Sequence, residues 1–598
     1  MGTCGIAAGA REVMHAILHE IEALNLDVTV VATGCVGLCS QEPLVDIEVP
    51  GGLRVTYGKV TPQMVPTLIS DHLVKGHVVT QWAVARGSTT PAPVRPQPET
   101  VKAIPTYDDI PFYGKQVRIA LRNCGVINPE EIQDYIVRGG YEALGRAILE
   151  MTPQDIIDTV KKAGLRGRGG AGFPAGLKWE FARKAAGDVK YIICNADEGD
   201  PGAFMDRSIL EGDPHSVVEG MCIAARAIGA QEGYIYCRAE YPLAIKRLER
   251  AIQQAHEHGL LGENILGSDF SFDLRIKQGA GAFVCGEETA LIASIEGRRG
   301  EPRPRPPFPA VSGLWGKPTS INNVETWANV PPILLHGPEW FSSIGTEKSK
   351  GTKVFALTGK VNKPGLVEVP MGITMKEIIY DIGGGIPNGK KFKAVQTGGP
   401  LGGCLPTSML DTPVDYDSLT SAGATMGSGG MIVIDEDTCM VEFAKFFLTF
   451  ATDESCGQCT PCRIGGKRML EVLTRITEGK GTMDDLKEIE QLARTMADTS
   501  LCALGQLTPN PTLSSLKHFR DEFLAHIVDK KCPAGVCTAL LHFEISPDKC
   551  KGCSLCLINC PSGAIDGARK QVHKIDQSKC IKCGSCYDVC RLDAVIKS

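Results

Sequence analysis

The C-terminal end of the chain carries two copies of one cysteine pattern, and this repeat constrains the fold more than any other feature. The copies are Cys550-x2-Cys553-x2-Cys556-x3-Cys560 and Cys580-x2-Cys583-x2-Cys586-x3-Cys590. Thiolates at this spacing ligate iron–sulfur clusters, and in a paired arrangement the fourth cysteine of each copy ligates the cluster of the other. The pattern predicts a ferredoxin domain with two 4Fe–4S clusters, whose ligand sets are Cys550, Cys553, Cys556 and Cys590, and Cys580, Cys583, Cys586 and Cys560.

The cysteine content of the whole chain also favours metal ligation over disulfide bonds. There are 24 cysteines in 598 residues, and the N-terminus shows no basic stretch followed by an apolar one. We therefore expect a reducing, cytoplasmic location. A net charge of −6 argues against a nucleic-acid binder, and no apolar run is long enough to span a bilayer. The length predicts several domains.

A glycine-rich stretch, GLRGRGGAGFPAGLKWEFARK, begins at Gly164. It predicts a loop that leads into a helix, and its bare backbone N–H groups can approach an anion closely, with Lys178 nearby. The apolar run Tyr191–Cys194 predicts a buried strand that ends in the polar turn Asn195–Glu198. A glycine loop followed by a polar strand end is typical of a nucleotide or flavin mononucleotide site, and the alternative is a flexible surface loop.

A third group of cysteines lies in a strongly helical stretch, 442–525. Cys456-x2-Cys459-x2-Cys462 wraps one loop, and Cys502 follows further on. Three cysteines at this spacing and a distant fourth are typical of a 4Fe–4S cluster. A structural zinc site is the alternative interpretation.

The stretch that follows, HIVDKKCPAGVCTALLHF, places two histidines and two cysteines close together. The spacing of His526, Cys532, Cys537 and His542 resembles a zinc knuckle. We predict a structural zinc near Cys532 and Cys537, with His526 the favoured histidine. The fourth ligand stays open; a distant residue such as Cys439 is one option. Two buried cysteines with two surface histidines are the alternative.

Several strings resemble the NADH-binding flavin subunit of respiratory complex I and its soluble relatives. Besides the glycine-rich stretch they are GAGAFVCGEETALIASIEG, RPPFPAVSGLWGKPTSINNVET and ESCGQCTPCRIG, and the resemblance covers about 112–526. The relatives include NAD(P)-linked hydrogenases, formate dehydrogenases and transhydrogenases, several of them flavin-based electron-bifurcating. Gly199 and Asp200 stand where complex I members usually carry Ser and Glu, so the chain looks more like the beta subunit of the soluble, bifurcating branch. NADH is the expected dinucleotide, and the preference between NAD and NADP stays open.

The resemblance and the composition together imply a multidomain α/β protein. The expected parts are a thioredoxin-like domain of the 2Fe–2S type (1–80), a Pro-rich linker (81–107), a Rossmann-like FMN- and NADH-binding domain (108–340), a ubiquitin-like β-grasp domain (341–430), a helical 4Fe–4S domain (431–530), a zinc connector (531–545) and the two-cluster ferredoxin domain (546–598).

The resemblance also implies the residues that bind the cofactors. It places flavin contacts on Gly167, Arg168, Gly169, Gly170, Lys178, Asn195, Asp197, Glu198, Phe283, Glu287, Glu288, Asn322 and Asn323. It places dinucleotide contacts on Phe173, Glu198, Asp200, Glu288, Arg305 and Phe308. Glu198 and Glu288 are the catalytic candidates, as groups that position and tune the cofactors. The alternatives are plain helix capping for the carboxylates of the GEET turn and a core position for the phenylalanines.

The N-terminal domain resembles a thioredoxin-like 2Fe–2S module with an incomplete ligand set. Cys35-x3-Cys39 follows a predicted strand, Val28–Val31, and Cys4 matches the second member of the expected C-x4-C pair. A 2Fe–2S cluster normally has four protein ligands. The sequence therefore leaves open whether another residue supplies the fourth or the domain acts only in docking.

Together these features predict a subunit that moves electrons between NAD(H) and iron–sulfur clusters. A flavin accepts two electrons as a hydride and passes them on singly, so it stands between the two. We expect a cytoplasmic, flavin-based electron-bifurcating complex that couples NAD(H), ferredoxin and a third couple: hydrogen, NADPH or formate. Partner subunits would supply that couple and a small thioredoxin-like 2Fe–2S protein. The alternatives are a non-bifurcating NADH dehydrogenase module and a non-catalytic electron-wire subunit.

Overall fold

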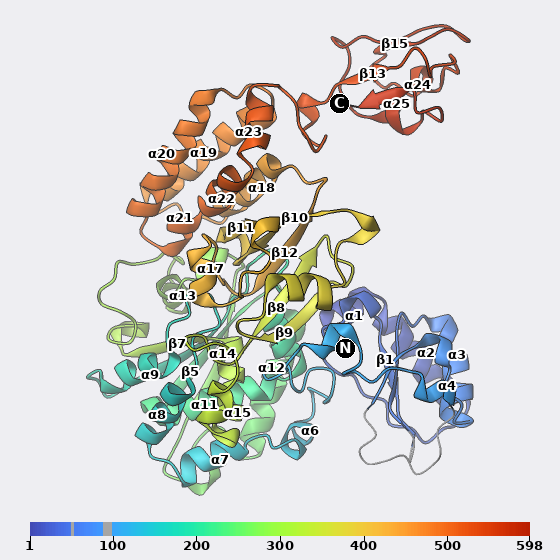
Figure 1. The fold of residues 1–598 in the computed structure, drawn as a ribbon. Coiled ribbons are helices and arrows are strands. Elements are labelled where there is room, and N and C mark those ends of the chain that lie inside the picture. Colours follow the sequence, from blue (N-terminus) through green and yellow to red (C-terminus); the bar gives the residue numbers. More distant parts are fainter. Residues whose placement is uncertain (50–52, 88–98, 598) are drawn as a thin grey trace. The chain divides into compact units, whose positions relative to one another are not determined.

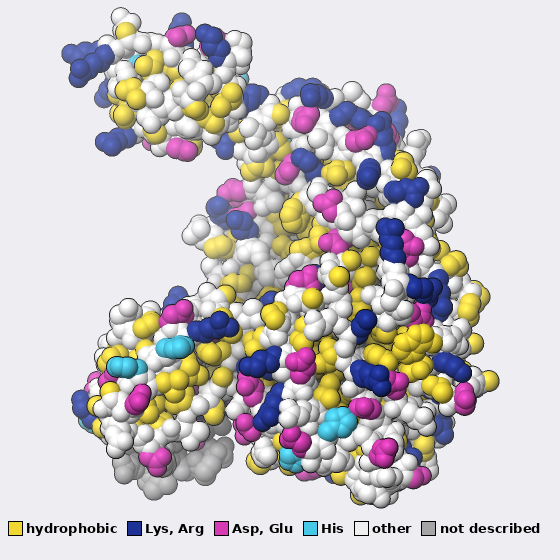
Figure 2. Space-filling model, turned by 180° about the vertical axis from the view of Figure 1, so that it is seen from behind, with side chains coloured by type: hydrophobic (Ala, Val, Ile, Leu, Met, Phe, Trp, Pro, Cys, Tyr) yellow, Lys and Arg dark blue, Asp and Glu magenta, His cyan; other side chains and the backbone are white. Residues whose placement is uncertain are grey.

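The computed structural model describes residues 1–49, 53–87 and 99–597. The chain divides into two compact units, Met1–Val433 and Ile434–Ser598, whose elements are labelled in Figure 1. Acidic and basic side chains are interspersed on the face shown in Figure 2, in keeping with the small net charge. No helix within the described ranges is long and apolar enough to cross a membrane.

The N-terminal domain packs helices against a three-stranded antiparallel sheet of order β1-β2-β3. The strands are β1 (Val45–Ile47), β2 (Val55–Tyr57) and β3 (Ala83–Arg86). The helices are α1 (Thr3–Ala7), α2 (Ala10–Ala23), α3 (Val65–Thr67) and α4 (Glu99–Lys102). Val13, Val55, Tyr57 and Leu68 are buried in its core.

The predicted boundary at residue 80 is wrong, because the domain continues into the stretch expected to be a linker. β3 is the third strand of the sheet, and Ala85 on it is fully buried. Val101 and Ile104 also pack into the same core. These apolar residues flank the proline-rich run that dominated the composition of 81–107. The run itself, 88–98, lies outside the described residues.

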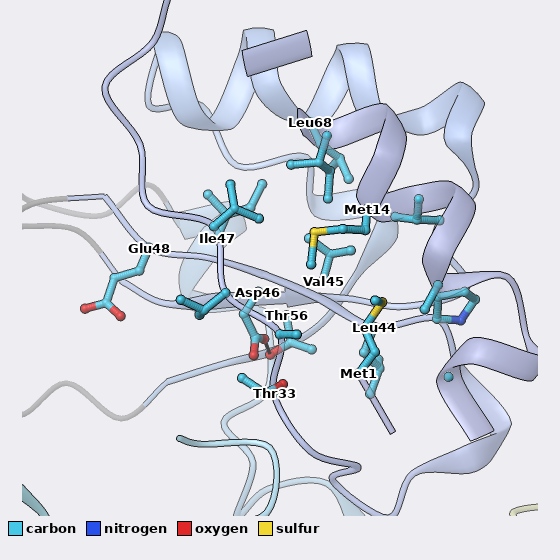
Figure 3. A pocket seen from close by; sticks show the side chains of 18 of the residues that line it. Met1, Met14, Thr33, Leu44, Val45, Asp46, Ile47, Glu48, Thr56 and Leu68 are labelled. Carbon is cyan, nitrogen blue, oxygen red and sulfur yellow. Dashed lines mark hydrogen bonds between the residues drawn. The ribbon is translucent and has the colours of Figure 1, made fainter. Parts of the chain in front are cut away.

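The strand predicted over 28–31 is not paired. Within the described residues, the backbone of 28–33 makes no hydrogen bond, and the facing edge of β1 is also free. A cavity of about 470 Å³ is lined by both segments. Figure 3 shows Met14, Val45, Ile47 and Leu68 around this cavity. Since paired strands lie about 4.8 Å apart, a cavity of this size keeps the two edges from pairing.

The central domain is built on a four-stranded parallel sheet of order β6-β5-β4-β7. The strands are β4 (Tyr191–Ala196), β5 (Glu232–Arg238), β6 (Asp273–Gly279) and β7 (Thr319–Asn323). The helices are α5 (Pro111–Gly114), α6 (Ile132–Val137), α7 (Glu142–Leu149), α8 (Pro153–Ala163), α9 (Ala175–Lys184), α10 (Met205–Gly212), α11 (Pro214–Ile228), α12 (Pro242–Glu257), α13 (Glu288–Ile295), α14 (Val324–Ala328), α15 (Val330–His336) and α16 (Pro338–Ser342). The buried strand predicted at Tyr191 is thus confirmed as β4.

The strand order of this sheet creates a switch point between β4 and β7. The chain runs from β4 to β5 and β6 on one side and then returns to place β7 on the other side of β4. Connections leave β4 and β7 in opposite directions, which opens a crevice at their carboxyl ends. Ligands of open α/β sheets bind in such crevices, so this edge is where the site is expected.

The next domain is a mixed five-stranded sheet of order β11-β10-β12-β8-β9, in which β8 pairs parallel with β12 and antiparallel with β9. The strands are β8 (Thr352–Gly359), β9 (Gly365–Pro370), β10 (Phe392–Thr397), β11 (Gly403–Pro406) and β12 (Gly430–Asp435). A helical segment, Glu377–Ile382, and α17 (Tyr416–Ser421) pack into the same core as the strands. The domain thus combines short strands with two helical segments, where the β-grasp prediction expected one helix.

The second unit begins with six helices and ends in a small cysteine-rich domain. The helices are α18 (Met440–Asp453), α19 (Thr460–Thr477), α20 (Met483–Thr499), α21 (Ala503–Leu507), α22 (Asn510–His518) and α23 (Arg520–Ile527). Their apolar faces form one core with Leu448, Met469, Ile489 and Phe523. The strongly helical stretch predicted from the sequence is therefore confirmed.

The last domain repeats one unit twice, as the cysteine pattern predicts. β13 (Phe543–Ile545) pairs antiparallel with β16 (Val595–Lys597), and β14 (Ile565–Asp566) pairs antiparallel with β15 (Lys574–Ile575). The short helices α24 (Leu555–Ile558) and α25 (Ser585–Asp588) each follow a left-handed residue, Ser554 and Gly584. Each cysteine run thus turns sharply at the same step.

Candidate active site and metal centres

The glycine loop connects α8 to α9, and residues at the ends of the two helices fix where each one begins and ends. Thr152 begins α8 with a capping box, and Gly164 ends α8 in the left-handed conformation at φ 71°. Across the loop, the Gly167 N–H donates to the Phe173 carbonyl at 2.8 Å. α9 then begins after Pro174. The loop is therefore a fixed turn rather than the flexible surface loop of the alternative interpretation.

The glycines of the loop lie against neighbouring segments as well as facing the site. A Cβ added to Gly169 would come within 3.0 Å of the Asn323 Cβ, and one added to Gly172 within 2.6 Å of the Tyr416 ring. The Tyr416 hydroxyl donates to the Gly167 carbonyl at 2.7 Å. The β-grasp domain thus holds the loop in place from the outside.

The side chain of Arg168, one of the residues predicted to contact the flavin, points into the protein. The side chain is fully buried, and its guanidinium donates to the carbonyls of Arg166 and Lys350 at 3.0 and 2.7 Å. The Arg168 amide donates to the Thr326 hydroxyl at 2.8 Å. These bonds tie the loop to the segment before β8 and to α14, so Arg168 supports the loop rather than facing its open side.

Lys178, Glu288 and Arg305 form one ion-paired group from three separate segments. The Lys178 ammonium lies 3.2 Å from Glu288 Oε2, and the Arg305 guanidinium lies 2.7 Å from Glu288 Oε1. Burial acts to raise the pKa of Glu288, but the two cations lower it on balance. The prediction that these three residues belong to one site is supported by their contact.

Asparagines stand at the carboxyl ends of β4 and β7, beside the switch point. Asn195 pairs in register with Asn323, and Asn322 lies one step earlier. The Asn195 amide donates to the Gly286 carbonyl at 2.9 Å, and Asn322 accepts from the Trp179 indole at 3.1 Å. Asn323 Oδ1 caps α14 by accepting from the Glu325 amide at 2.9 Å. These side chains fix the crevice edge to the turn before α13.

Glu198 is buried and held by backbone amides at the start of α10. Its two carboxylate oxygens accept from the amides of Asp206 and Arg207, each at 3.1 Å. The Tyr241 hydroxyl donates to the Glu198 carbonyl at 3.0 Å. Burial raises the pKa of Glu198 in spite of these donors. Within the protein, the Glu198 carboxylate therefore holds the turn 195–200 against the start of α10.

Asp200 faces the loops of the β-grasp domain. The Ser428 hydroxyl donates to its carboxylate, and a Cβ added to Gly399 would lie 2.4 Å from Asp200 Oδ2. Burial raises the pKa of Asp200 to about 6. Asp197, earlier in the same turn, donates its amide to Asn195 Oδ1 at 3.1 Å. The acidic turn therefore joins the central domain to the β-grasp domain.

For the phenylalanines and for the two glutamates of the GEET turn, the sequence left a ligand-binding role and a structural role open. Phe173 and Phe308 are 49% and 55% exposed, which excludes a core position and leaves their rings free to stack on a ligand. Phe283 begins the turn before α13. Glu287 accepts from the amides of Thr289 and Ala290 at 2.8 and 2.9 Å, so its carboxylate is a helix cap. Within the GEET turn, capping accounts for Glu287 and ion pairing for Glu288.

The cysteines predicted for the 4Fe–4S cluster lie at helix starts in the second unit. Cys459 precedes α19, Cys502 precedes α21, and Cys456 lies in the loop before α19. A Cβ added to Gly505 would lie 2.9 Å from the Cys462 Cβ, so α21 packs against the cysteine loop. The Ser455 hydroxyl lies 3.1 Å from Cys462 Sγ. The helix that begins directly after the distant fourth cysteine, Cys502, therefore packs against this loop.

The residues predicted for zinc meet in a buried cluster that also contains Cys439. His526, Cys532, Cys537 and Cys439 place their ligand atoms within 4.8 Å of one another, and all four are buried. His526 Nε2 lies 3.3 Å from both Cys439 Sγ and Cys537 Sγ. Hydrogen bonds from Cys439 and Cys537 lower the pKa of the Cys532 thiol. Four such ligands at this distance fit a closed tetrahedral site.

A backbone carbonyl that is not part of the cluster fixes the orientation of the His526 imidazole. His526 Nδ1 lies 2.7 Å from the Glu522 carbonyl, one turn earlier on α23, and donates to it. That bond leaves Nε2 facing the three thiols, the arrangement that metal-bound histidines show. His542 is exposed and does not belong to the cluster. The alternative of two surface histidines therefore applies to His542 alone.

A second thiol cluster lies in the N-terminal domain. Cys4, Cys35 and Cys39 place their Sγ atoms within 4.8 Å of one another, and the Cys4–Cys35 distance is 3.2 Å. Hydrogen bonds from Cys35 and Cys39 lower the pKa of Cys4 to about 3. The loop of Cys35 packs on the central domain, since a Cβ added to Gly34 would lie 2.4 Å from the Gly212 Cα. The structure thus gathers three thiols, whereas a 2Fe–2S cluster normally has four protein ligands.

The cysteines of the ferredoxin domain line two separate cavities. Cys550, Cys553, Cys556 and Cys590 line one, and Cys580, Cys583, Cys586 and Cys560 line the other. The two sets are those predicted from the repeat, including the exchange of the fourth cysteine. The fold therefore brings each ligand set to its own site.

Comparison with known families defines the class of protein. Residues 160–332 match the Nuo51 FMN-binding domain, and 442–526 match the NADH-ubiquinone oxidoreductase-F iron-sulfur binding region. Residues 354–405 match the SLBB domain, and 542–591 match a 4Fe-4S dicluster domain. With the crevice and cysteine sets above, these matches describe an oxidoreductase subunit that carries an FMN-binding domain and iron–sulfur domains.

Individual relatives place the chain in a family. It is 62% identical over 483 residues to the NADP-reducing hydrogenase subunit HndC of Solidesulfovibrio fructosivorans, a match that covers 81% of this chain and 98% of that relative. It is 50% identical over 69% of its length to an NADH-quinone oxidoreductase subunit of Rhizobium meliloti, of which 99% is covered. A crystal structure of NAD+-reducing [NiFe]-hydrogenase in the air-oxidized state matches with a TM-score of 0.61 and 31% identity, covering 88% of this chain and 84% of that chain. The chain belongs to the complex I flavoprotein family, as its sequence motifs indicated.

Proposed function

We propose that this chain is the NAD(H)-oxidising or NAD(H)-reducing subunit of a cytoplasmic, flavin-based electron-bifurcating complex. One observation carries the proposal. A single chain combines a flavin crevice at a sheet switch point with cysteine sets for three 4Fe–4S clusters, two of them in a ferredoxin domain. The complex would couple NAD(H) and ferredoxin to a third couple supplied by partner subunits. The relative from Solidesulfovibrio favours hydrogen or NADPH as that couple.

In this proposal the glycine loop and α9 hold the phosphate of FMN. The backbone N–H groups near Gly169 and Gly170 approach it, and Lys178 supplies a positive charge. Asn195, Asn322 and Asn323 present amides at the crevice edge. When bound, the flavin accepts a hydride and releases electrons singly. The protein's part is to orient the ring system over the strand ends and to exclude water.

The dinucleotide would bind at the open side of the same crevice. The exposed rings of Phe173 and Phe308 provide faces for stacking. The Arg305 guanidinium lies 5.8 Å from the centre of the Phe308 ring and pairs with Glu288, which fixes its fork toward the same region. Asp200 is the remaining proposed dinucleotide contact, and it lies in the acidic turn beside the loops of the β-grasp domain.

Two further metal centres belong to the proposal. Zinc at Cys439, His526, Cys532 and Cys537 is structural, because all four ligand positions of a tetrahedral site are filled by protein. A 2Fe–2S cluster at Cys4, Cys35 and Cys39 requires one more ligand. A small thioredoxin-like 2Fe–2S protein is the expected partner that provides a second electron exit.

The test separates NADH oxidation from ferredoxin coupling. We expect the isolated chain to reduce artificial dyes with NADH but not to reduce ferredoxin. The complete complex should reduce ferredoxin with NADH only when the third couple is present. Truncation after Ser546 should abolish ferredoxin coupling and spare NADH-to-dye activity.

Three results would contradict parts of this proposal. If the complete complex reduced a single acceptor with NADH at full rate and never required a third couple, the chain would serve a non-bifurcating NADH dehydrogenase module. If the purified chain contained clusters but no flavin absorbance, it would be an electron wire without the flavin step. Unchanged ferredoxin coupling after truncation would place the ferredoxin port on a partner protein.

A further inference from the structure

The two halves of the ferredoxin domain differ at one aromatic position. Phe543 precedes Cys550 by seven residues, and His573 precedes Cys580 by the same number. Each begins or adjoins a short strand, β13 and β15. The internal repeat therefore places a phenylalanine in one copy where the other copy has a histidine.

Each of these rings faces the cysteines of the opposite copy. Phe543 lines the cavity of Cys580, Cys583, Cys586 and Cys560, here called the Cys580 cluster site. His573 lines the cavity of Cys550, Cys553, Cys556 and Cys590, here called the Cys550 cluster site. The two sites have the same number of thiolates but different walls. The Cys550 site contains His573, whereas the Cys580 site contains Ser562 and Ser585, whose hydroxyls lie 3.7 Å from Cys560 Sγ and 3.3 Å from Cys583 Sγ.

The position of the imidazole is fixed by its surroundings. His573 is 1% exposed, and its Nδ1 lies 4.0 Å from Cys550 Sγ. A Cβ added to Gly567 would lie 2.7 Å from the ring, so the imidazole packs closely against the backbone that follows β14. Nε2 is buried without a hydrogen-bond partner within the described part of the chain. A thiolate ligand accepts and cannot donate, so the ring nitrogen that faces Cys550 is a donor.

We propose that His573 donates a hydrogen bond to the Cys550 thiolate and thereby raises the reduction potential of the Cys550 cluster. Hydrogen bonds to cluster sulfur are among the factors that set the potential of an iron–sulfur cluster. The reduced cluster carries one more negative charge, so a donor stabilises it more than the oxidised form. At the equivalent position of the other copy, the Phe543 ring offers no such donor.

The inference rests on the two 4Fe–4S clusters proposed for this domain, and iron content tests that premise separately. The experiment is an anaerobic potentiometric titration of the full chain, with dithionite as the one-electron donor and EPR as the readout. The signals of this domain are those that disappear on truncation after Ser546. For His573→Phe we expect the reduced-to-oxidised ratio of one cluster of this domain to fall about tenfold at a given solution potential, a shift of about 59 mV, while the other cluster keeps its potential.

Two matched variants sharpen the result. His573→Asn keeps an N–H donor and should retain most of the wild-type potential, which a merely structural role would not predict. Phe543→His adds a donor beside the Cys580 cluster and should raise the potential of that cluster, the one that His573→Phe leaves unchanged. If His573→Phe lost iron, Phe543→His would decide the question in an otherwise native site. Unchanged potentials in His573→Phe with full iron, or in Phe543→His, would overturn the proposal.

Discussion

The flavin crevice and the four-residue metal cluster differ in what holds their side chains in place. In the crevice, Glu198 is held by two backbone amides and Glu288 by two cations. In the metal cluster, three thiols and one imidazole face one another within 4.8 Å. The first site is organised by protein contacts before any ligand binds. The second gathers groups that a metal ion would hold, and metal binding of this kind contributes directly to folding.

This contrast predicts opposite responses to ligand loss. Removing the flavin should leave the central domain folded, because its ion pairs and caps remain. Removing zinc should destabilise the helical part of the second unit, because Cys439, His526 and the pair Cys532 and Cys537 come from three separate segments.

The largest effect is expected for the metal cluster. Cys439→Ser and Cys532→Ser should each remove about one zinc per chain and lower the midpoint of thermal unfolding of the second unit, while flavin content stays unchanged. Metal analysis of an anaerobic preparation and a thermal melt provide the measurements. His542→Ala is the matched control, because this exposed histidine lies outside the cluster. Zinc content equal to wild type in both serine variants would contradict the assignment of a zinc site to this cluster.

The next effect is expected at the glycine loop. A side chain at position 169 meets the Asn323 Cβ at 3.0 Å and blocks approach of the backbone to the phosphate. Gly169→Val should therefore yield flavin-free protein that keeps its clusters and its zinc. Gly145→Val is the control, because a Cβ at that position meets no atom within 4 Å. Full flavin occupancy in Gly169→Val, measured by absorbance after gel filtration, would contradict the assignment of the loop.

A smaller effect is expected for Lys178. Lys178→Met removes one charge-assisted contact to the flavin phosphate, worth about 1.5–3 kcal/mol, so flavin affinity should fall roughly 10- to 150-fold. Lys184→Met, on the same helix but in an exposed pair with Glu180, should leave the affinity near wild type. Fluorescence titration of flavin into the apoprotein measures both. Equal affinities for the two variants would show that Lys178 does not face the phosphate.

Local patterns were the part of the molecule that the sequence predicted well. The ferredoxin ligand sets follow from a repeat, because cysteines three or four positions apart must lie on one loop. The buried strand at Tyr191 and the cap at Thr152 are also decided within a few residues. The resemblance extended this to the family, since its motifs are long and specific.

Contacts between distant segments escaped prediction from single stretches. The burial of the Arg168 side chain depends on the Lys350 carbonyl, far along the chain. The N-terminal sheet extends to β3 because Ala85 finds a buried place beside β2, which a proline-rich composition did not indicate. The strand predicted at Val28 lacks a pairing neighbour, and pairing is a property of the sheet rather than of the strand.

The sequence by itself determined the chemistry of this protein: which residues are thiolates, which loop is bare of side chains, and which family they belong to. Only the tertiary structure decided which of these groups meet. Cys439 joins His526 because α18 and α23 pack on one core, and Glu288 joins Lys178 and Arg305 because three segments converge beside the switch point. The physical reason is that ligand and charge types are properties of single residues, whereas burial and distance arise from packing between segments far apart in the chain.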